Sequence, residues 1–188
     1  MSTREASAAE DPIIESLDQL VAPMIAGEKP AERWRIGTEH EKLVFRGPDH
    51  HAPAYCEDGG IRDILLALAE FGWEPVEEGG QVIAMRGADG TVSLEPAGQL
   101  ELSGAPLENL HETCAETGRH LRQVKEVGER FGVGFLGLGM WPDKRRDELP
   151  IMPKGRYEIM LRHMPRVGTL GLDMMLRTCT IQVNLDYS

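Results

Sequence analysis

The sequence has few cysteines, no long apolar run and no leader-like start, and each shortage excludes a class of protein. The three cysteines, Cys56, Cys114 and Cys179, are too few and too far apart for a disulfide framework or a zinc knuckle. No apolar run reaches the roughly 20 residues that span a bilayer. The first ten residues hold two glutamates and no apolar segment, so we expect neither a secretory signal nor a transit peptide. These features predict a cytoplasmic protein with reduced thiols.

Positive charge is scarce as well. The 188 residues carry 20 Lys and Arg against 31 Asp and Glu, a formal net charge of −11. The one basic cluster, at 144–146, lies between Asp143 and Asp147 and is typical of a solvated loop. We therefore expect no nucleic acid and no membrane as partner. An acidic chain can still bind a nucleotide if divalent cations lie between its carboxylates and the phosphates.

The common nucleotide-binding and hydrolase motifs are missing. The sequence contains no GxxxxGK[ST], no HExxH and no GxSxG. GVGFLG at 132–137 matches GxGxxG, but it follows a predicted helix and lies in an apolar strand. A dinucleotide-binding fingerprint must instead follow a strand and open a helix. Close packing of chain segments explains these glycines better.

What is present is a mixture of helical and strand patterns. In the first helix, Asp11 is the predicted cap and Pro12 the first helical residue. Helical spacing of apolar residues predicts helices over 12–26, 60–71, 106–131 and 156–164. Alternation and β-forming residues predict strands over 35–46, 81–86, 91–95, 99–103, 133–141 and 174–187.

These elements predict an α+β fold with a largely antiparallel sheet and flanking helices. The segment GADG at 87–90 lies between two predicted strands and is a hairpin signal. A parallel sheet of βαβ units fits less well, because strands and helices do not alternate regularly. The chain stops directly after a strong strand, which would lie at an edge of the sheet, so we expect a truncated chain.

Acidic residues on strands are the main functional signal. Side chains alternate between the two faces of a strand, so Glu39 and Glu41 share one face of strand 35–46. Glu101 lies on the polar face of strand 99–103. Magnesium prefers such hard oxygen ligands, usually a few carboxylates with water and phosphate. Solvated strand edges would show the same alternation, so both explanations stay open.

The C-terminal stretch 174–187 alternates fully between polar and apolar residues. Its polar positions are Thr178, Thr180, Gln182, Asn184 and Asp186. A solvated face usually carries long charged side chains, whereas these residues suit a semi-enclosed cavity that binds a ligand. Together with the acidic strands, and without a P-loop, they favour phosphoryl transfer in which cations neutralise a triphosphate.

Four segments resemble one known family. They are GTEHEK at 37–42, EPAGQLELSGAP at 95–106, PIMPKGRY at 150–157 and GTLGLDMMLRTCTIQVNLD at 168–186. Over roughly residues 33–188 the chain resembles the glutamate–cysteine ligases of plants and many proteobacteria. Because members of that family are more than twice as long, the resemblance implies the N-terminal portion of a ligase. Residues 1–30 are then the N-terminal helix predicted from periodicity, and the resemblance implies the first part of the catalytic domain in 31–188, without the C-terminal half.

The resemblance also implies an activity. ATP would phosphorylate the side-chain carboxylate of L-glutamate, and the amino group of L-cysteine would attack the acyl phosphate, as the first step of glutathione biosynthesis. The implied fold is a curved antiparallel sheet that forms a funnel like that of glutamine synthetase, with Mg²⁺ at its floor. A related carboxylate–amine ligase with another amine acceptor and a non-catalytic nucleotide-binding fragment are the alternatives.

Site residues follow from the same resemblance. The implied metal ligands are Glu39, Glu41, Glu95 and Glu101, and the residues that face the metal and nucleotide are Gln182 and Asn184. Arg156 and Arg177 are candidates for holding a substrate carboxylate or phosphate, because the Arg fork suits such groups. Cys114 resembles a redox-regulated cysteine of plant members, although helical periodicity also makes it a core residue.

Overall fold

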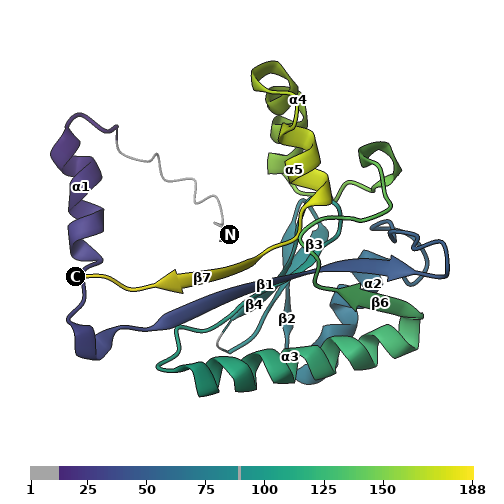
Figure 1. Cartoon of the computed structure of the whole chain (residues 1–188), viewed down its shortest axis with the longest axis horizontal. Helices are drawn as coiled ribbons and strands as arrows, with labels where there is room; N and C mark the ends of the chain where they lie inside the picture. Colours follow the sequence, from purple (N-terminus) through teal and green to yellow (C-terminus); the bar gives the residue numbers. More distant parts are fainter. Residues whose placement is uncertain (1–12, 89) are drawn as a thin grey trace.

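The computed structural model describes residues 13–88 and 90–188 (Figure 1). Its centre is an open sheet with the strand order β2-β3-β4-β5-β1-β6, and β7 also pairs with β1. The paired strands run antiparallel throughout this sheet. The predicted α+β class with a mainly antiparallel sheet is therefore confirmed, and the parallel alternative is excluded.

The strands are β1 (Ile36–Arg46), β2 (Glu74–Glu78), β3 (Gln81–Arg86), β4 (Thr91–Leu94), β5 (Leu100–Ser103), β6 (Val133–Leu136) and β7 (Ile181–Leu185). The long strand β1 organises the sheet, because it pairs with three partners. Glu39 and His40 face β5 on one side and β7 on the other, whereas the end of β1 pairs with β6. Strand β1, from the first quarter of the chain, thus pairs directly with β7, from its last residues.

The helices are α1 (Leu17–Ala26), α2 (Ile61–Ala67), α3 (Leu110–Phe131), α4 (Gly155–Val167) and α5 (Gly171–Arg177). Helices α2 and α3 contact each other and cover one face of the sheet, whereas α4 and α5 pack together on the other side (Figure 1). None of the helices described is long and apolar enough to cross a membrane.

The hydrophobic core lies between the sheet and the pair α2 and α3. It includes Ile64 and Leu65 of α2 and Val124 and Val127 of α3, together with apolar residues of the strands. Leu100 and Leu102 of β5 are both buried. Because strand side chains alternate, the burial of these two leucines turns Glu101 toward the opposite face of the sheet.

The N-terminal helix starts later than predicted. Helix α1 begins at Leu17, and Ser16 caps it with a hydrogen bond from a backbone amide to its side chain. The predicted cap and first residue, Asp11 and Pro12, lie outside the described residues. The apolar stripe of α1 is exposed, with no buried residue in the helix. The periodicity predicted an amphipathic helix correctly, but it could not show whether another element covers the apolar side.

Helix α3 also differs from its prediction at the N-terminal end. It begins at Leu110 with Asn109 as its cap, not at Pro106. Leu110 and Cys114 are exposed, whereas Val124 and Val127, further along the helix, belong to the core. The prediction that Cys114 faces the core is therefore wrong. On the first half of the helix the buried positions are polar, at Glu116 and His120.

The predicted strand 174–187 is two elements. Residues 171–177 form helix α5, which packs on α4, and pairing with β1 begins only at Ile181. Arg177 thus lies at the end of a helix and not on a strand. Cys179, in the connection, is buried as predicted.

Two further strands depart from the sequence pattern. Strand β2 was not predicted because it is rich in charge, as edge strands commonly are. Strand β6 ends at Leu136 and not at residue 141. A Cβ on Gly134 would overlap the ring of Phe45, so this glycine serves close strand packing, as expected for the GxGxxG match.

Candidate metal centre

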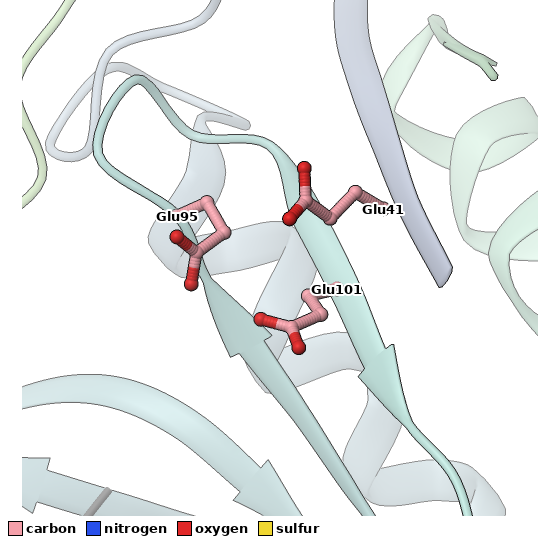
Figure 2. A group of neighbouring side chains, drawn as sticks. All are labelled: Glu41, Glu95 and Glu101. Atoms are coloured by element: carbon pink, nitrogen blue, oxygen red, sulfur yellow. The ribbon is translucent and has the colours of Figure 1, made fainter. Parts of the chain in front are cut away.

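Three of the predicted metal ligands point toward one another in the structure. Figure 2 shows the carboxylates of Glu41, Glu95 and Glu101 around a common space. One oxygen from each side chain lies within 4.8 Å of the others. Among the described residues this is the only group of His, Cys, Asp or Glu side chains that meets this criterion. We call these three residues the carboxylate triad.

Strand pairing brings two members of the triad together. Glu41 on β1 is the direct cross-strand partner of Glu101 on β5. Direct partners on one face of an antiparallel pair have Cβ atoms about 5 Å apart. Glu101 is held in place by hydroxyl groups, since Ser103 Oγ donates to its Oε1 at 3.0 Å and Ser93 Oγ donates at 3.4 Å to Oε2.

A tight turn between β4 and β5 adds Glu95. Its amide donates to the carbonyl of Gln99 at 2.9 Å, and Gly98 completes the turn with φ +85°. The side chain of Gln99 fastens the turn to the end of α5, because Nε2 donates to the carbonyl of Thr178 at 2.7 Å. Local strand periodicity does not extend to Glu95, and the turn geometry determines where its carboxylate lies.

The electrostatics of the triad favour a bound cation. Burial, the charge of Glu101 and a hydrogen bond between the two carboxyl groups raise the pKa of Glu95 to about 7. Burial and the charge of Glu101 also raise the pKa of Glu41. Carboxylates packed this closely repel one another unless a proton or a cation lies between them. Their hard oxygen atoms are the donor set that Mg²⁺ prefers, so the residues present fit this ion.

The segment before and within α4 supplies positive charge beside the triad. Arg156 donates to Glu95 Oε1 at 3.4 Å and to the hydroxyl of Tyr157 at 3.1 Å. Tyr157 and Lys154 both donate to the carbonyl of Leu94, at 2.8 and 2.6 Å. Burial lowers the pKa of Lys154 to about 8. Arg156 thus lies next to the carboxylate triad, and its role in holding a substrate group stays a prediction.

Lys154 and Tyr157 were missed by the sequence reasoning. Both are buried, and both hold the end of β4 one residue before Glu95. A signal was present, because both residues belong to PIMPKGRY, the segment that contains Arg156. A buried lysine is costly unless it is hydrogen-bonded or paired, so its burial beside two glutamates indicates a defined role at this site.

Glu39, Gln182 and Asn184 form a polar row on the same face of the sheet, outside the triad. Gln182 is the cross-strand partner of Glu39. Asn184 Nδ2 lies 3.5 Å from Glu39 Oε1, and Gln182 Nε2 donates to Asn184 Oδ1 at 3.0 Å. The row adjoins the triad, because Glu41 lies two residues after Glu39 on the same face of β1. The prediction that Glu39 and Glu41 share one face of the strand is confirmed. A role of Glu39 as a metal ligand stays a prediction.

Arg177 lies in a different environment. Its guanidinium contacts Asp173 at 3.3 Å and the carbonyl of Trp141 at 3.5 Å. It lines a shallow, charged depression together with Arg145, Arg146, Asp147 and Asp173. None of its contacts in the described part of the chain joins it to the triad, so its predicted role is not supported by proximity.

Known proteins similar to this chain are ligases by name. Glutamate–cysteine ligase A, chloroplastic, from Oryza sativa subsp. japonica is 54% identical over 187 residues, which cover 99% of this chain. The chloroplastic glutamate–cysteine ligases of Brassica juncea and Arabidopsis thaliana are each 52% identical over the same share of this chain. The chain spans only 37% of the length of the rice relative and 35% of the other two.

The names of these relatives correct one prediction. They place the relatives in the chloroplast, which contradicts the predicted cytoplasmic location. The prediction relied on a start without a leader-like pattern, on the lack of a membrane-spanning apolar run and on cysteines without a disulfide pattern. Reduced cysteines suit any reducing compartment, so they cannot distinguish one such compartment from another.

The family assignment rests on a larger part of the chain than the motifs alone. The family model described as glutamate-cysteine ligase family 2 (GCS2) matches residues 35–188. This match includes the carboxylate triad, the polar row and the segment that carries Arg156. The chain therefore belongs to glutamate–cysteine ligase family 2.

Proposed function

We propose that this chain provides the metal-binding part of an ATP-dependent glutamate–cysteine ligase. The observation that carries the proposal is the carboxylate triad, formed by three strand and turn residues of a chain that belongs to this family. In this proposal residues 31–188 are the first part of the catalytic domain. The C-terminal part of the active site would come from sequence beyond the region matched here.

The proposed reaction has two steps. The side-chain carboxylate of L-glutamate attacks the γ-phosphorus of ATP, which gives an acyl phosphate and releases ADP. The amino group of L-cysteine then attacks the acyl carbon, loses a proton and displaces inorganic phosphate, so that an amide bond forms. Both steps develop negative charge on phosphoryl oxygens, and a site for them must therefore stabilise that charge.

The residues of the site have separate roles in this proposal. Glu41, Glu95 and Glu101 would hold Mg²⁺, which neutralises phosphate charge when bound. Arg156 lies beside Glu95 and would donate hydrogen bonds to a phosphoryl group or a substrate carboxylate. Gln182 and Asn184 lie further along the same face and would contact the nucleotide, next to Glu39.

The substitution Glu101→Gln tests the proposal. It keeps the size of the side chain and the acceptor for Ser103 but removes the charge of the most buried member of the triad. In the longer protein that supplies the C-terminal part of the active site, we expect ATP hydrolysis that requires both L-glutamate and L-cysteine to fall by about 100-fold or more, with a higher Mg²⁺ requirement.

Glu129→Gln is the matched control, because Glu129 is exposed on α3 and its nearest ion pair, with Lys125, is long at 4.0 Å. Its activity should stay within about twofold of the unchanged protein, as expected for a surface substitution. Equal activity of the Glu101→Gln and Glu129→Gln proteins would reject the triad as a metal site. Activity with other amines in place of L-cysteine would identify the related ligase instead.

A further inference from the structure

A polar cavity lies on the face of the sheet opposite the carboxylate triad. It has a volume of about 210 Å³ and lies between α3, the Phe71–Trp73 segment and the connection of β3 to β4. Leu102 of β5 also lines it. Because Leu102 and Glu101 point to opposite faces of β5, the sheet separates this cavity from the carboxylate triad. We call it the α3 cavity.

Four polar residues of α3 line the cavity: Glu116, Arg119, His120 and Gln123. Their spacing of three and four residues places them on one face of the helix. Glu116 and His120 are almost completely buried, with 9% and 2% of their surface exposed. A core-facing helix surface normally carries apolar side chains at such positions, so these polar side chains need a separate explanation.

The buried polar atoms of this face are only partly satisfied. Glu116 Oε1 accepts a hydrogen bond from the amide of Ala105 at 2.8 Å. Its Oε2 atom is buried and has no partner among the described residues, and the same holds for both ring nitrogens of His120. Burial, followed by the charges of Lys42 and His40, lowers the pKa of His120 to about 3, so the ring is neutral. The side chains of Glu116, Arg119 and the neutral His120 all line the α3 cavity.

The chemistry of the lining restricts the ligand. A metal ion is disfavoured, since among the described residues Glu116 and His120 belong to no group of three His, Cys, Asp or Glu side chains with ligand atoms within 4.8 Å of one another. The volume exceeds by more than tenfold the roughly 10–15 Å³ that one water molecule needs, but it is below the roughly 300 Å³ of common ligand pockets. A small molecule with both a positive and a negative group matches Glu116 and Arg119.

We propose that the α3 cavity binds a free α-amino acid, with its ammonium group on Glu116 and its carboxylate on Arg119. These residues are three positions apart on one helix face, with Cβ atoms about 5–6 Å apart, which suits the adjacent charges of an α-amino acid. His120 and Gln123 add hydrogen-bonding groups, and Phe71 and Trp73 provide apolar walls for the side chain. This site is independent of the proposed ligase site.

Trp73 gives a direct readout of binding. Its indole Nε1 donates to Gln123 Oε1 at 3.1 Å, so the indole lies at the cavity wall in a defined position. We would titrate the ¹⁵N-labelled protein with the common L-amino acids and follow the Trp73 indole resonance, assigned with Trp73→Phe. The best ligand would then be compared with its des-amino acid and its decarboxylated amine.

The variants separate this cavity from the carboxylate triad. Arg119→Gln changes an exposed residue and should weaken binding by about tenfold or more, the loss expected for a charge-assisted hydrogen bond. Arg122→Gln, on an exposed neighbouring position outside the lining, should bind within about twofold of the unchanged protein. Glu101→Gln should also bind normally, whether or not the proposed ligase activity exists.

Selective binding of the zwitterion, lost in Arg119→Gln alone, would support the proposal. No shift of the Trp73 resonance with any L-amino acid would overturn it. Equal affinity for the des-amino acid or for the amine would overturn it too, and so would equal weakening by Arg119→Gln and Arg122→Gln.

Discussion

At the scale of single residues, burial and then the proximity of like charges shape the candidate metal centre. Glu95 has a pKa of about 7 against an ordinary value of 4.5, so the folded protein holds a proton that the unfolded chain releases. Stability linked to this group is present below about pH 4.5 and is lost as the pH rises toward 7. A bound cation would replace that proton at higher pH.

This linkage predicts a pH-dependent response to Mg²⁺. Between pH 5 and pH 7.5, thermal unfolding of the unchanged protein should lose stability relative to Glu95→Gln, because only the former must ionise a buried carboxyl group. Mg²⁺ should raise the unfolding temperature at pH 7.5 more than at pH 5, and it should have little effect on Glu95→Gln. An identical pH profile for the two proteins would contradict the assignment.

The cysteines give a second prediction at this scale. Cys56 and Cys114 are exposed, whereas Cys179 is buried. Burial, followed by the charge of Glu41, also raises the pKa of Cys179 to about 11, so little thiolate forms near neutral pH. A chromogenic disulfide reagent should therefore titrate two thiols rapidly and the third only after unfolding. Cys179→Ser should not change the rapid phase, and three thiols reacting at one rate would contradict this expectation.

At the scale of elements, the turn between β4 and β5 controls the geometry of the triad. Gly98 has φ +85°, and a Cβ there would lie 3.1 Å from the side chain of Ile61. The turn therefore requires glycine for both backbone conformation and space. A shift of this turn would move Glu95 relative to Glu101, although neither glutamate is altered.

Gly98→Ala should therefore impair both stability and metal binding. We expect a loss of about 2 kcal/mol or more in the free energy of unfolding, from left-handed backbone strain plus the contact with Ile61. Gly79→Ala is the matched control, because Gly79 has φ +57° with open space around it. It should cost only about 1–2 kcal/mol. Urea unfolding measures both, and equal losses with equal Mg²⁺ affinity would show that the turn does not position Glu95.

At the scale of the whole molecule, the two faces of the sheet have different chemistry. One face carries the carboxylate triad and the polar row, and the other is covered by α2 and α3 (Figure 1). Strand β7 adds exposed apolar residues, namely Ile181, Val183 and Leu185. Together with the exposed stripe of α1, they leave considerable apolar surface in contact with water.

This surface predicts self-association of the 188-residue chain. Replacing Val183 and Leu185 with threonine places β-branched residues, which suit a strand, at both positions. It should reduce both dye binding to apolar surface and concentration-dependent association. Leu110→Thr removes one exposed leucine at the start of α3 and serves as the control. Light scattering and gel filtration measure the effect. If the control and the β7 variant behave alike, β7 is not the associating surface.

Patterns with a short period were predictable from the sequence. Alternation placed Glu39 and Glu41 on one face, and it placed Glu101 opposite the buried leucines of β5, because side-chain direction on a strand depends only on parity. The same rule failed over 174–177, which belong to helix α5, packed on α4, and not to a strand. Arg177 was misplaced on a strand for this reason.

Sequence alone determined the antiparallel α+β class, the parity of the acidic strands and, through four long segments, the family. Tertiary structure decided what lies next to what. It brought Glu95 to Glu41 and Glu101 through a turn, buried Lys154 and Tyr157 behind that turn, and left Cys114 and the stripe of α1 exposed. The physical reason is that side-chain direction is a local property of the backbone. Burial and charge proximity instead depend on segments far apart in the chain.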